Sequence, residues 1–311
     1  MIGFNLATLS IFSIPPAMIW LPSTLIAGLF QAWRTAVQAR LRGTLSVNAA
    51  GLVRYLYGFP VALLLAVTYV GGQLPQLGTG FAFWAVLGGL AQLLATNLLL
   101  MAFGYRNYVV GTAYAKTEAI QGALLAFVLL GERLTWLSLV GILVGVAGVL
   151  VLSTGGEKLR FADLKQPAAL CGLGAGFLFA LTAVFVKLAT HEVASDDAIK
   201  RALITLVAVV GGQLLMQGLY VIVRERDQVA AIFKSWRVSA QVGLLAALGS
   251  AFWFTAFASA PVALVRAVGQ VEVIFTLLFG RFYLHEAMKR SEIAGLLLVG
   301  SGVVLALLGA L

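Results

Sequence analysis

Apolar runs long enough to cross a lipid bilayer follow one another along almost the whole chain. A transmembrane helix needs about 20 apolar residues, and short polar or Gly/Pro-rich gaps divide the sequence into ten such runs. The predicted spans cover residues 19–39, 47–70, 81–104, 107–130, 135–153, 168–189, 199–223, 240–259, 261–284 and 291–310. We therefore predict an all-α integral membrane protein with ten transmembrane helices.

The composition argues against a water-soluble domain. Of 311 residues, 61% are hydrophobic and 11% are charged, whereas about 25% of residues are charged in soluble proteins. The net charge of +9 comes largely from Lys and Arg in the gaps between apolar runs, not from a basic patch interleaved with aromatic residues. This pattern is typical of membrane flanks rather than of a nucleic-acid surface. The predicted surrounding is the lipid bilayer, with no nucleic-acid partner.

The sequence lacks the motifs of the common enzyme classes. It has no GxxxxGK[ST] phosphate-binding loop, so ATP-driven transport by this chain alone is not expected. The two histidines, His191 and His285, are far apart, and one cysteine cannot complete a Cys/His metal set. We predict no enzyme activity, no catalytic residues, no metal site and no cofactor.

The two halves of the chain repeat one another. A shift of 154 residues places Glu118 on Glu272 and Glu132 on Glu286, although the chain has only twelve acidic residues. A weaker match, at an offset of 148, joins AGLFQAW (27–33) to AGFLFAL (175–181). These matches indicate an internal duplication.

The duplication divides the chain into four parts: an N-terminal extension (1–18), a first repeat (19–153), a linker (154–167) and a second repeat (168–311). The extension is not translated if Met18 is the start. Each repeat holds five spans, an odd number, so the second repeat enters the membrane from the opposite face. Inverted repeats of this kind are a common design of secondary transporters, in which two halves enclose a substrate site near the midplane.

Two segments show the duplication most clearly: AIQGALLAFVLLGERLTWLSLVGILVGVAGVLVL (119–152) and VIFTLLFGRFYLHEAMKRSEIAGLLLVGSGVVLALL (273–308). In both, an apolar helix ends near a Glu and is followed by a short loop and a Gly-rich helix. With these segments the chain resembles the drug/metabolite transporter superfamily of ten-helix carriers built from two EamA-type repeats. The resemblance implies transport of small organic metabolites such as amino acids, in the direction of export, across the inner (plasma) membrane.

Two glutamates, Glu118 and Glu272, lie at equivalent places near the middle of the fourth and ninth spans. An ionised carboxylate at this depth persists only when it is paired, faces water or takes a proton. Lys116 is two residues from Glu118 and points away from it on a helix, so other helices must supply partners, with Arg34 and Arg54 as candidates. Fixed interhelical pairing, proton carriage and substrate contact are the three roles left open for these glutamates.

Further polar residues recur on single helical faces within the spans. Gln31 and Arg34 share one face of the first span, and Arg266 and Gln270 share one face of the ninth. Such faces contact protein or water rather than lipid, although an interhelical hydrogen bond also explains a single glutamine, and packing a single tryptophan. The substrate-cavity candidates are Gln31, Arg34, Arg54, Gln92, Tyr114, Gln121, Trp253, Arg266 and Gln270.

These features together predict a secondary active transporter, a monomer or homodimer, with a small-molecule substrate and with Glu118 and Glu272 as proton-coupling candidates. A gradient-independent facilitator or a channel is the alternative, followed by a membrane receptor, a scaffold or a membrane enzyme. Three basic residues lie in gaps on the side of the termini and twelve in gaps on the other side. This bias places both termini outside the cell, whereas the family resemblance implies cytoplasmic termini.

Overall fold

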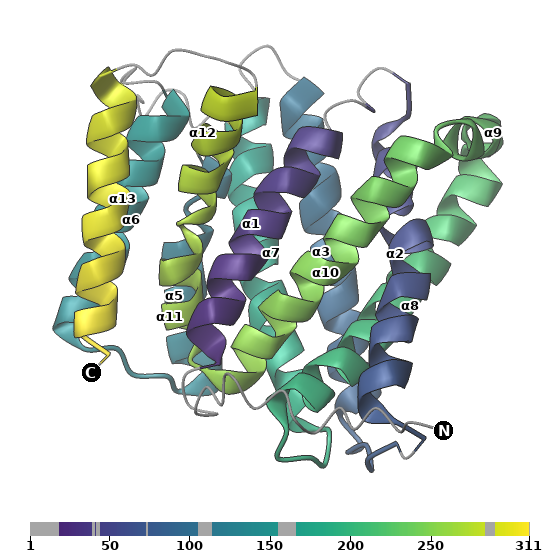
Figure 1. The fold of residues 1–311 in the computed structure, drawn as a ribbon, viewed down its shortest axis with the longest axis horizontal. Coiled ribbons are helices and arrows are strands. Elements are labelled where there is room, and N and C mark those ends of the chain that lie inside the picture. Colours follow the sequence, from purple (N-terminus) through teal and green to yellow (C-terminus); the bar gives the residue numbers. More distant parts are fainter. Residues whose placement is uncertain are drawn as a thin grey trace, which may run out of the picture.

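The computed structural model describes residues 19–38, 41, 44–72, 74–104, 114–154, 166–283 and 290–310. Within these ranges the regular structure is helical, apart from one isolated β-bridge between Leu77 and Val193. The helices are α1 (Trp20–Gln38), α2 (Val47–Val70), α3 (Phe81–Gly104), α5 (Glu118–Leu130), α6 (Trp136–Thr154), α7 (Pro167–His191), α8 (Ala198–Arg224), α9 (Arg226–Lys234), α10 (Trp236–Ser259), α11 (Val262–Gly269), α12 (Glu272–Tyr283) and α13 (Arg290–Leu308). They form one bundle (Figure 1).

The surface and the interior of this bundle have the polarity expected in lipid. Leu64, Leu215 and Leu297 are 63%, 74% and 70% exposed, whereas the side chains of Gln213 and Arg54 are buried. A water-soluble protein has the opposite arrangement. Five helices, α2, α3, α7, α8 and α10, are long and apolar enough to cross a membrane, and α5, α6 and α13 contain shorter apolar segments.

Eight of the ten predicted spans match helices to within four residues at each end. The span predicted at 261–284 is not one helix: it is divided into α11 and α12, so that prediction is wrong. Helix α5 begins only at Glu118. Three predicted segments lie wholly or largely outside the described residues: the start of the fourth span (107–113), the N-terminal extension (1–18) and most of the linker (154–167). Helix α9 lies in the gap between the predicted spans 199–223 and 240–259 and was not predicted.

A close tertiary contact accompanies the break between α11 and α12. At the break the backbone hydrogen bonds join residues three apart instead of four, as in a 3₁₀-helix. Gln270 N donates to Ala267 O (3.3 Å) and Val271 N to Val268 O (3.0 Å). The indole of Trp253 packs on Gly269, where an added Cβ would lie 2.5 Å from Cη2. Glycine is the residue that admits a ring this close to the backbone. The break therefore coincides with the close packing of Trp253 on Gly269, and the sequence around it contains no proline that would have predicted it.

Helices α2 and α8, which are equivalent in the two repeats, pack against each other in opposite directions. Ser46, the N-cap of α2, hydrogen-bonds to Glu225, which directly follows α8. Tyr69, near the end of α2, donates to Asp197, the N-cap of α8, at 3.0 Å. Since each end of α2 meets the opposite end of α8, the two helices are antiparallel.

Helices α6 and α13 form a second antiparallel pair, at one edge of the bundle (Figure 1). Ser138 Oγ, near the start of α6, donates to Ala306 O, near the end of α13, at 3.1 Å. The facing glycines allow the backbones to touch, because a Cβ added at Gly141 would lie 2.6 Å from Gly302 O. Small residues at a helix interface are typical of membrane proteins.

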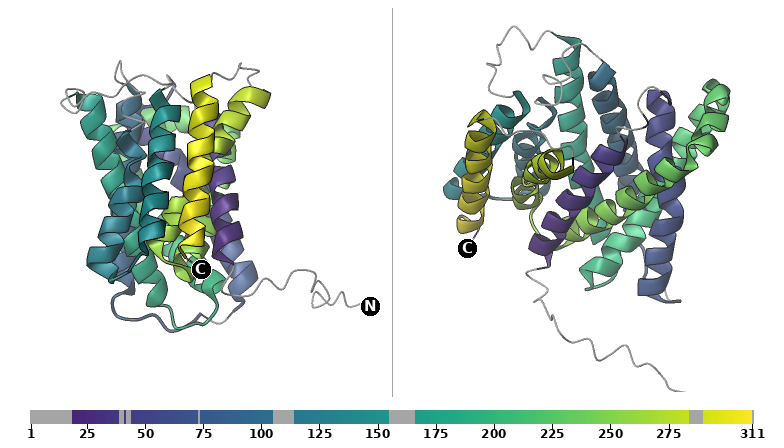
Figure 2. Two further views of the ribbon diagram at one scale, coloured as in Figure 1. Left: turned by 90° about the vertical axis from the view of Figure 1, so that its left-hand side faces the viewer. Right: turned by 45° about the horizontal axis from the view of Figure 1, so that its top comes forward.

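Other packed pairs join the repeats into one body. Helix α1 packs on α10 and α3 packs on α7, so in each pair one helix comes from each repeat. Both pairs lie between the α6–α13 edge and α2 with α8 (Figures 1 and 2). The core is therefore shared by the two repeats.

Candidate functional site

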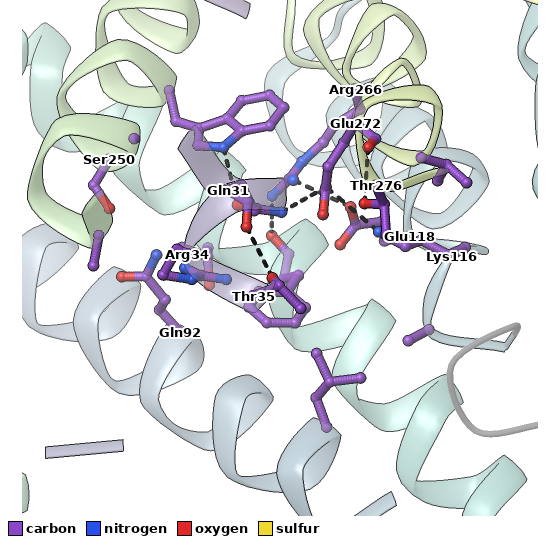
Figure 3. Close-up of a pocket in the computed structure, with 18 of the residues that line it drawn as sticks. Gln31, Arg34, Thr35, Gln92, Lys116, Glu118, Ser250, Arg266, Glu272 and Thr276 are labelled. Atoms are coloured by element: carbon purple, nitrogen blue, oxygen red, sulfur yellow. Dashed lines mark hydrogen bonds and ion pairs between the residues drawn. The ribbon is translucent and has the colours of Figure 1, made fainter. Parts of the chain in front are cut away.

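A cavity of about 290 Å³ lies between the two repeats. Its polar lining consists of Gln31, Arg34, Thr35, Arg54, Gln92, Lys116, Glu118, Thr182, Ser250, Arg266, Glu272 and Thr276, and its aromatic lining of Phe179, Trp253, Phe254 and Phe257. Figure 3 shows Gln31 between Arg34 and the group formed by Lys116, Glu118 and Glu272. A cavity with charged, amide and aromatic groups suits a small amphipathic molecule.

The two glutamates of the cavity are the first residues of helices. Glu118 begins α5 and Glu272 begins α12. The N-terminus of a helix carries partial positive charge, which stabilises a carboxylate in the first turn. Both glutamates therefore lie near the middle of a predicted span and at the start of a half-length helix, where the helix dipole favours an anion.

Two glycines, 148 residues apart, provide the space for these helix starts. On α1, a Cβ added at Gly28 would lie 3.5 Å from the backbone N of Glu272. On α7, a Cβ added at Gly176 would lie 2.8 Å from Ala115 O and 3.4 Å from Glu118 N. The weak sequence match between residues 27–33 and 175–181 therefore marks structurally equivalent positions, each facing the half-helix of the other repeat.

Arg266 of α11 is the partner of Glu118. Its Nη1 atom lies 3.3 Å from Glu118 Oε1, and its Nη2 atom donates to Phe179 O at 2.8 Å. The guanidinium also lies over the rings of Trp253 and Phe257, 5.4 and 5.2 Å from their centroids. Aromatic faces attract a cation, so four groups hold this buried arginine.

Lys116 and Gln31 are the partners of Glu272. Lys116 Nζ lies 3.4 Å from Glu272 Oε2, and Gln31 Nε2 donates to the same oxygen at 2.6 Å. The Oε1 atom of Gln31 accepts a hydrogen bond from Trp253 Nε1 at 3.1 Å. The prediction that Lys116 does not pair with Glu118 is confirmed, and the carboxylate it does reach belongs to the other repeat.

The prediction that Arg34 and Arg54 pair with the glutamates is wrong. Arg54 Nη1 donates to Thr96 Oγ1 at 2.8 Å, whereas Arg34 makes no hydrogen bond or ion pair with a described residue. On α1 it is Gln31, three residues before Arg34, that reaches Glu272. Both arginines line the cavity, so they present their charges to it without a carboxylate partner.

The remaining candidates divide between the cavity and its surroundings. Gln92 lines the cavity and accepts a hydrogen bond from Gln213 Nε2 at 2.8 Å. Tyr114 and Gln121 are not among the lining residues; Gln121 Nε2 donates to Thr117 Oγ1 at 2.8 Å. Gln270 does not line the main cavity either, because its amide packs on Gly145 of α6. Trp253, by contrast, forms part of the lining.

Several residues that line the cavity are not among those predicted from the sequence. Thr35, Phe179, Phe254, Phe257 and Thr276 carry no signal that separates them from ordinary apolar or weakly polar span residues. Lys116 had a signal, because a lysine within an apolar run needs a partner as much as a glutamate does.

The arrangement agrees with comparisons to known proteins. Residues 18–154 and residues 166–308 each match the EamA-like transporter family. In addition, 29 chains in solved structures are similar to this chain. One crystal structure, described only as that of a protein, has a TM-score of 0.72 at 18% identity, over 92% of this chain and 98% of its own, which shows a shared fold. No curated protein matches. Since the two family matches cover both repeats, the chain belongs to the EamA-like transporter family.

Proposed function

We propose that the protein is a secondary active transporter that exports small polar organic metabolites, such as amino acids and related compounds, across the inner (plasma) membrane. Family membership supports transport of small molecules across a membrane. The observation that carries the proposal is the cavity between the repeats, at the starts of α5 and α12. Inverted-repeat carriers bind substrates at discontinuous helices of this kind.

The proposal includes ten membrane spans arranged as two inverted repeats, at 19–153 and 168–311. The antiparallel packing of α2 with α8 and of α6 with α13 supports it. Alternating access then consists of movement of one repeat relative to the other around the shared cavity.

Glu118 and Glu272 are the proposed proton acceptors. Each carboxylate faces the cavity and holds a cation, Arg266 for Glu118 and Lys116 for Glu272. Protonation of a carboxylate removes the charge that holds its cation, and so weakens the contact between the segments that bear the two side chains. For Glu272 this loosens Lys116 and Gln31, which couples proton binding to the packing of α12 on α1.

The proposal is tested by efflux from proteoliposomes loaded with a mixed metabolite panel, with and without an inward proton gradient, and read by mass spectrometry. We expect the gradient to accelerate the loss of one compound class, and Glu118→Gln or Glu272→Gln to abolish that acceleration. Asp227→Asn is the matched control, because Asp227 is an exposed carboxylate on α9. Loss of a compound at the same rate without a gradient would identify a facilitator or channel and leave the two glutamates a structural role.

A further inference from the structure

We propose that the cavity binds an organic anion, with a carboxylate or phosphate group of the ligand placed on Arg34 and Arg54. This inference rests on the proposed function and specifies its substrate class. It follows from three features of the cavity: the excess of positive charge in its lining, the arginine N–H donors that have no partner among the described residues, and the apolar wall beside them.

The charged lining of the cavity is unbalanced. Four described lining residues are basic and two are acidic, namely Arg34, Arg54, Lys116, Arg266, Glu118 and Glu272. Each acidic residue has its own cation in an ion pair. Two positive charges are therefore left over, and in surroundings of low dielectric constant a ligand of opposite charge relieves their cost.

The two charges left over belong to arginines with free donors. The Nε atoms of Arg34 and Arg54 are both buried and make no hydrogen bond with the part of the chain that the structure describes. Arg54 is only 6% exposed, and the groups it contacts, the Thr96 hydroxyl and the Tyr55 ring 5.6 Å away, are neutral. A guanidinium has five N–H donors in a planar fork that matches the oxygens of a carboxylate or phosphate. Both side chains are thus equipped to bind an oxyanion.

The glutamates give no comparable site for a cationic ligand. Glu118 is held by Arg266, and Glu272 by Lys116 together with the amide of Gln31. A ligand ammonium group would have to displace a resident cation, whereas an oxyanion meets donors that have no other partner. The lining therefore favours negative over positive net charge in the ligand.

The apolar lining accommodates the rest of the ligand. Leu245, Trp253, Phe254 and Phe257 contribute to the wall. The volume of about 290 Å³ is at the lower limit of the roughly 300–1,000 Å³ typical of pockets for drug-sized molecules. The expected ligand is a metabolite-sized anion with a short carbon skeleton.

Binding of matched anionic and neutral compounds to the purified full-length protein tests the inference. The thermal unfolding midpoint is measured in detergent, at an ionic strength fixed with sodium chloride, against three pairs: succinate and succinamide, glutarate and glutaramide, glycerol 3-phosphate and glycerol. We expect at least one anion to raise the midpoint and its neutral partner not to. The phosphate pair and the carboxylate pairs distinguish the two oxyanion types.

Variants of Arg34 separate binding from folding. Because Arg34 has no partner among the described residues, Arg34→Gln should leave the ligand-free midpoint unchanged or raise it, while the anion affinity falls at least about tenfold, equivalent to about 1.4 kcal/mol. Arg34→Lys, which keeps the charge, should recover part of the affinity. Arg224→Gln, which removes an exposed arginine at the end of α8, should change neither quantity.

The inference is overturned if the neutral compounds stabilise the protein as well as the anions do, or if no anion of the panel stabilises it. It is also overturned if Arg34→Gln lowers the ligand-free midpoint and leaves the anion affinity intact. Its failure is distinct from failure of the proposed function. An anion that binds but is not moved by a proton gradient in proteoliposomes contradicts the transport mechanism alone. Gradient-driven efflux of a neutral compound contradicts the anion site alone.

Discussion

Lys187 and Glu132 form an ion pair, with Nζ 3.0 Å from Oε1, at the end of the bundle where α10 turns into α11 (lower in Figure 1). The same carboxylate accepts hydrogen bonds from Val262 N (3.1 Å) and Ala263 N (3.4 Å), and Lys187 donates to Ala260 O (2.7 Å). These bonds connect α7, the residues after α5 and the start of α11. They fasten three segments to one another at this end of the structure.

Loss of these contacts should increase the exposure of the turn between α10 and α11. We expect Glu132→Gln to increase the labelling rate of a cysteine placed at Ser259 about tenfold, a change of about 1.4 kcal/mol in the opening equilibrium. Labelling is measured with a membrane-impermeant maleimide in a Cys171→Ser background. Glu192→Gln is the control, because Glu192 follows α7 and its carboxylate contacts Gly80 instead. Equal rates in the two variants would show that the ion pair does not hold this end closed.

The pair of Arg266 and Glu118 should be strongly coupled in stability. Arg266→Met leaves a partly buried carboxylate without its cation, a change that costs about 3–5 kcal/mol. The double variant with Glu118→Gln removes the stranded charge and should recover much of the loss, whereas independent sites would give additive losses. Reversible unfolding in detergent, followed by circular dichroism, measures all four members of the cycle. Additive losses would contradict the coupling.

The α6–α13 interface should tolerate no added methyl group at Gly302. A Cβ there would overlap the backbone of Gly145, so Gly302→Ala should destabilise the protein by about 1–3 kcal/mol. Gly300 is on the same helix and has no atom within 4 Å of an added Cβ. Gly300→Ala should therefore be neutral or stabilising by up to about 1 kcal/mol. Thermal unfolding in detergent compares the two, and an equal effect would show that the helices do not approach this closely.

Gln213 should matter for stability and not for substrate binding. Its side chain is fully buried and donates to Gly89 O (3.0 Å) and to Gln92 Oε1. Gln213→Leu removes both bonds and leaves Gln92 Oε1 without this donor, which we expect to cost about 1–3 kcal/mol in unfolding free energy. Ligand affinity should change less than about twofold, well under the 1.4 kcal/mol of a tenfold effect. A large loss of affinity at unchanged stability would assign Gln213 to the site.

Much of the helical layout was predictable because the ends of the spans coincide with polar gaps. The 47–70 and 81–104 spans agree with α2 and α3 at both ends. The break between α11 and α12 could not be predicted, because residues 261–284 are long and apolar enough for a single span despite a few polar residues, and Gly269 is explained equally well by ordinary helix packing. The contact that requires Gly269 comes from Trp253, on another helix.

Part of the candidate site could be predicted from the rule that a polar residue within a span must face protein or water. This rule selected Gln31, Arg34 and Arg54, which line the cavity. It could not select their partners, because pairing depends on how distant helices cross. Lys116 and Glu272 are 156 residues apart, and only the assembled bundle brings them to 3.4 Å.

The positions of Gly28 and Gly176 bear on how such a chain arose and how it folds. Gly28 of the first repeat accommodates the start of α12 in the second, and Gly176 of the second accommodates the start of α5 in the first. Each repeat thus provides the space that a half-helix of the other requires, as the two subunits of an interlocked homodimer do for each other. A single repeat expressed alone would leave its half-helix without this packing partner. A substitution at Gly28 or Gly176 therefore affects the packing of the opposite repeat.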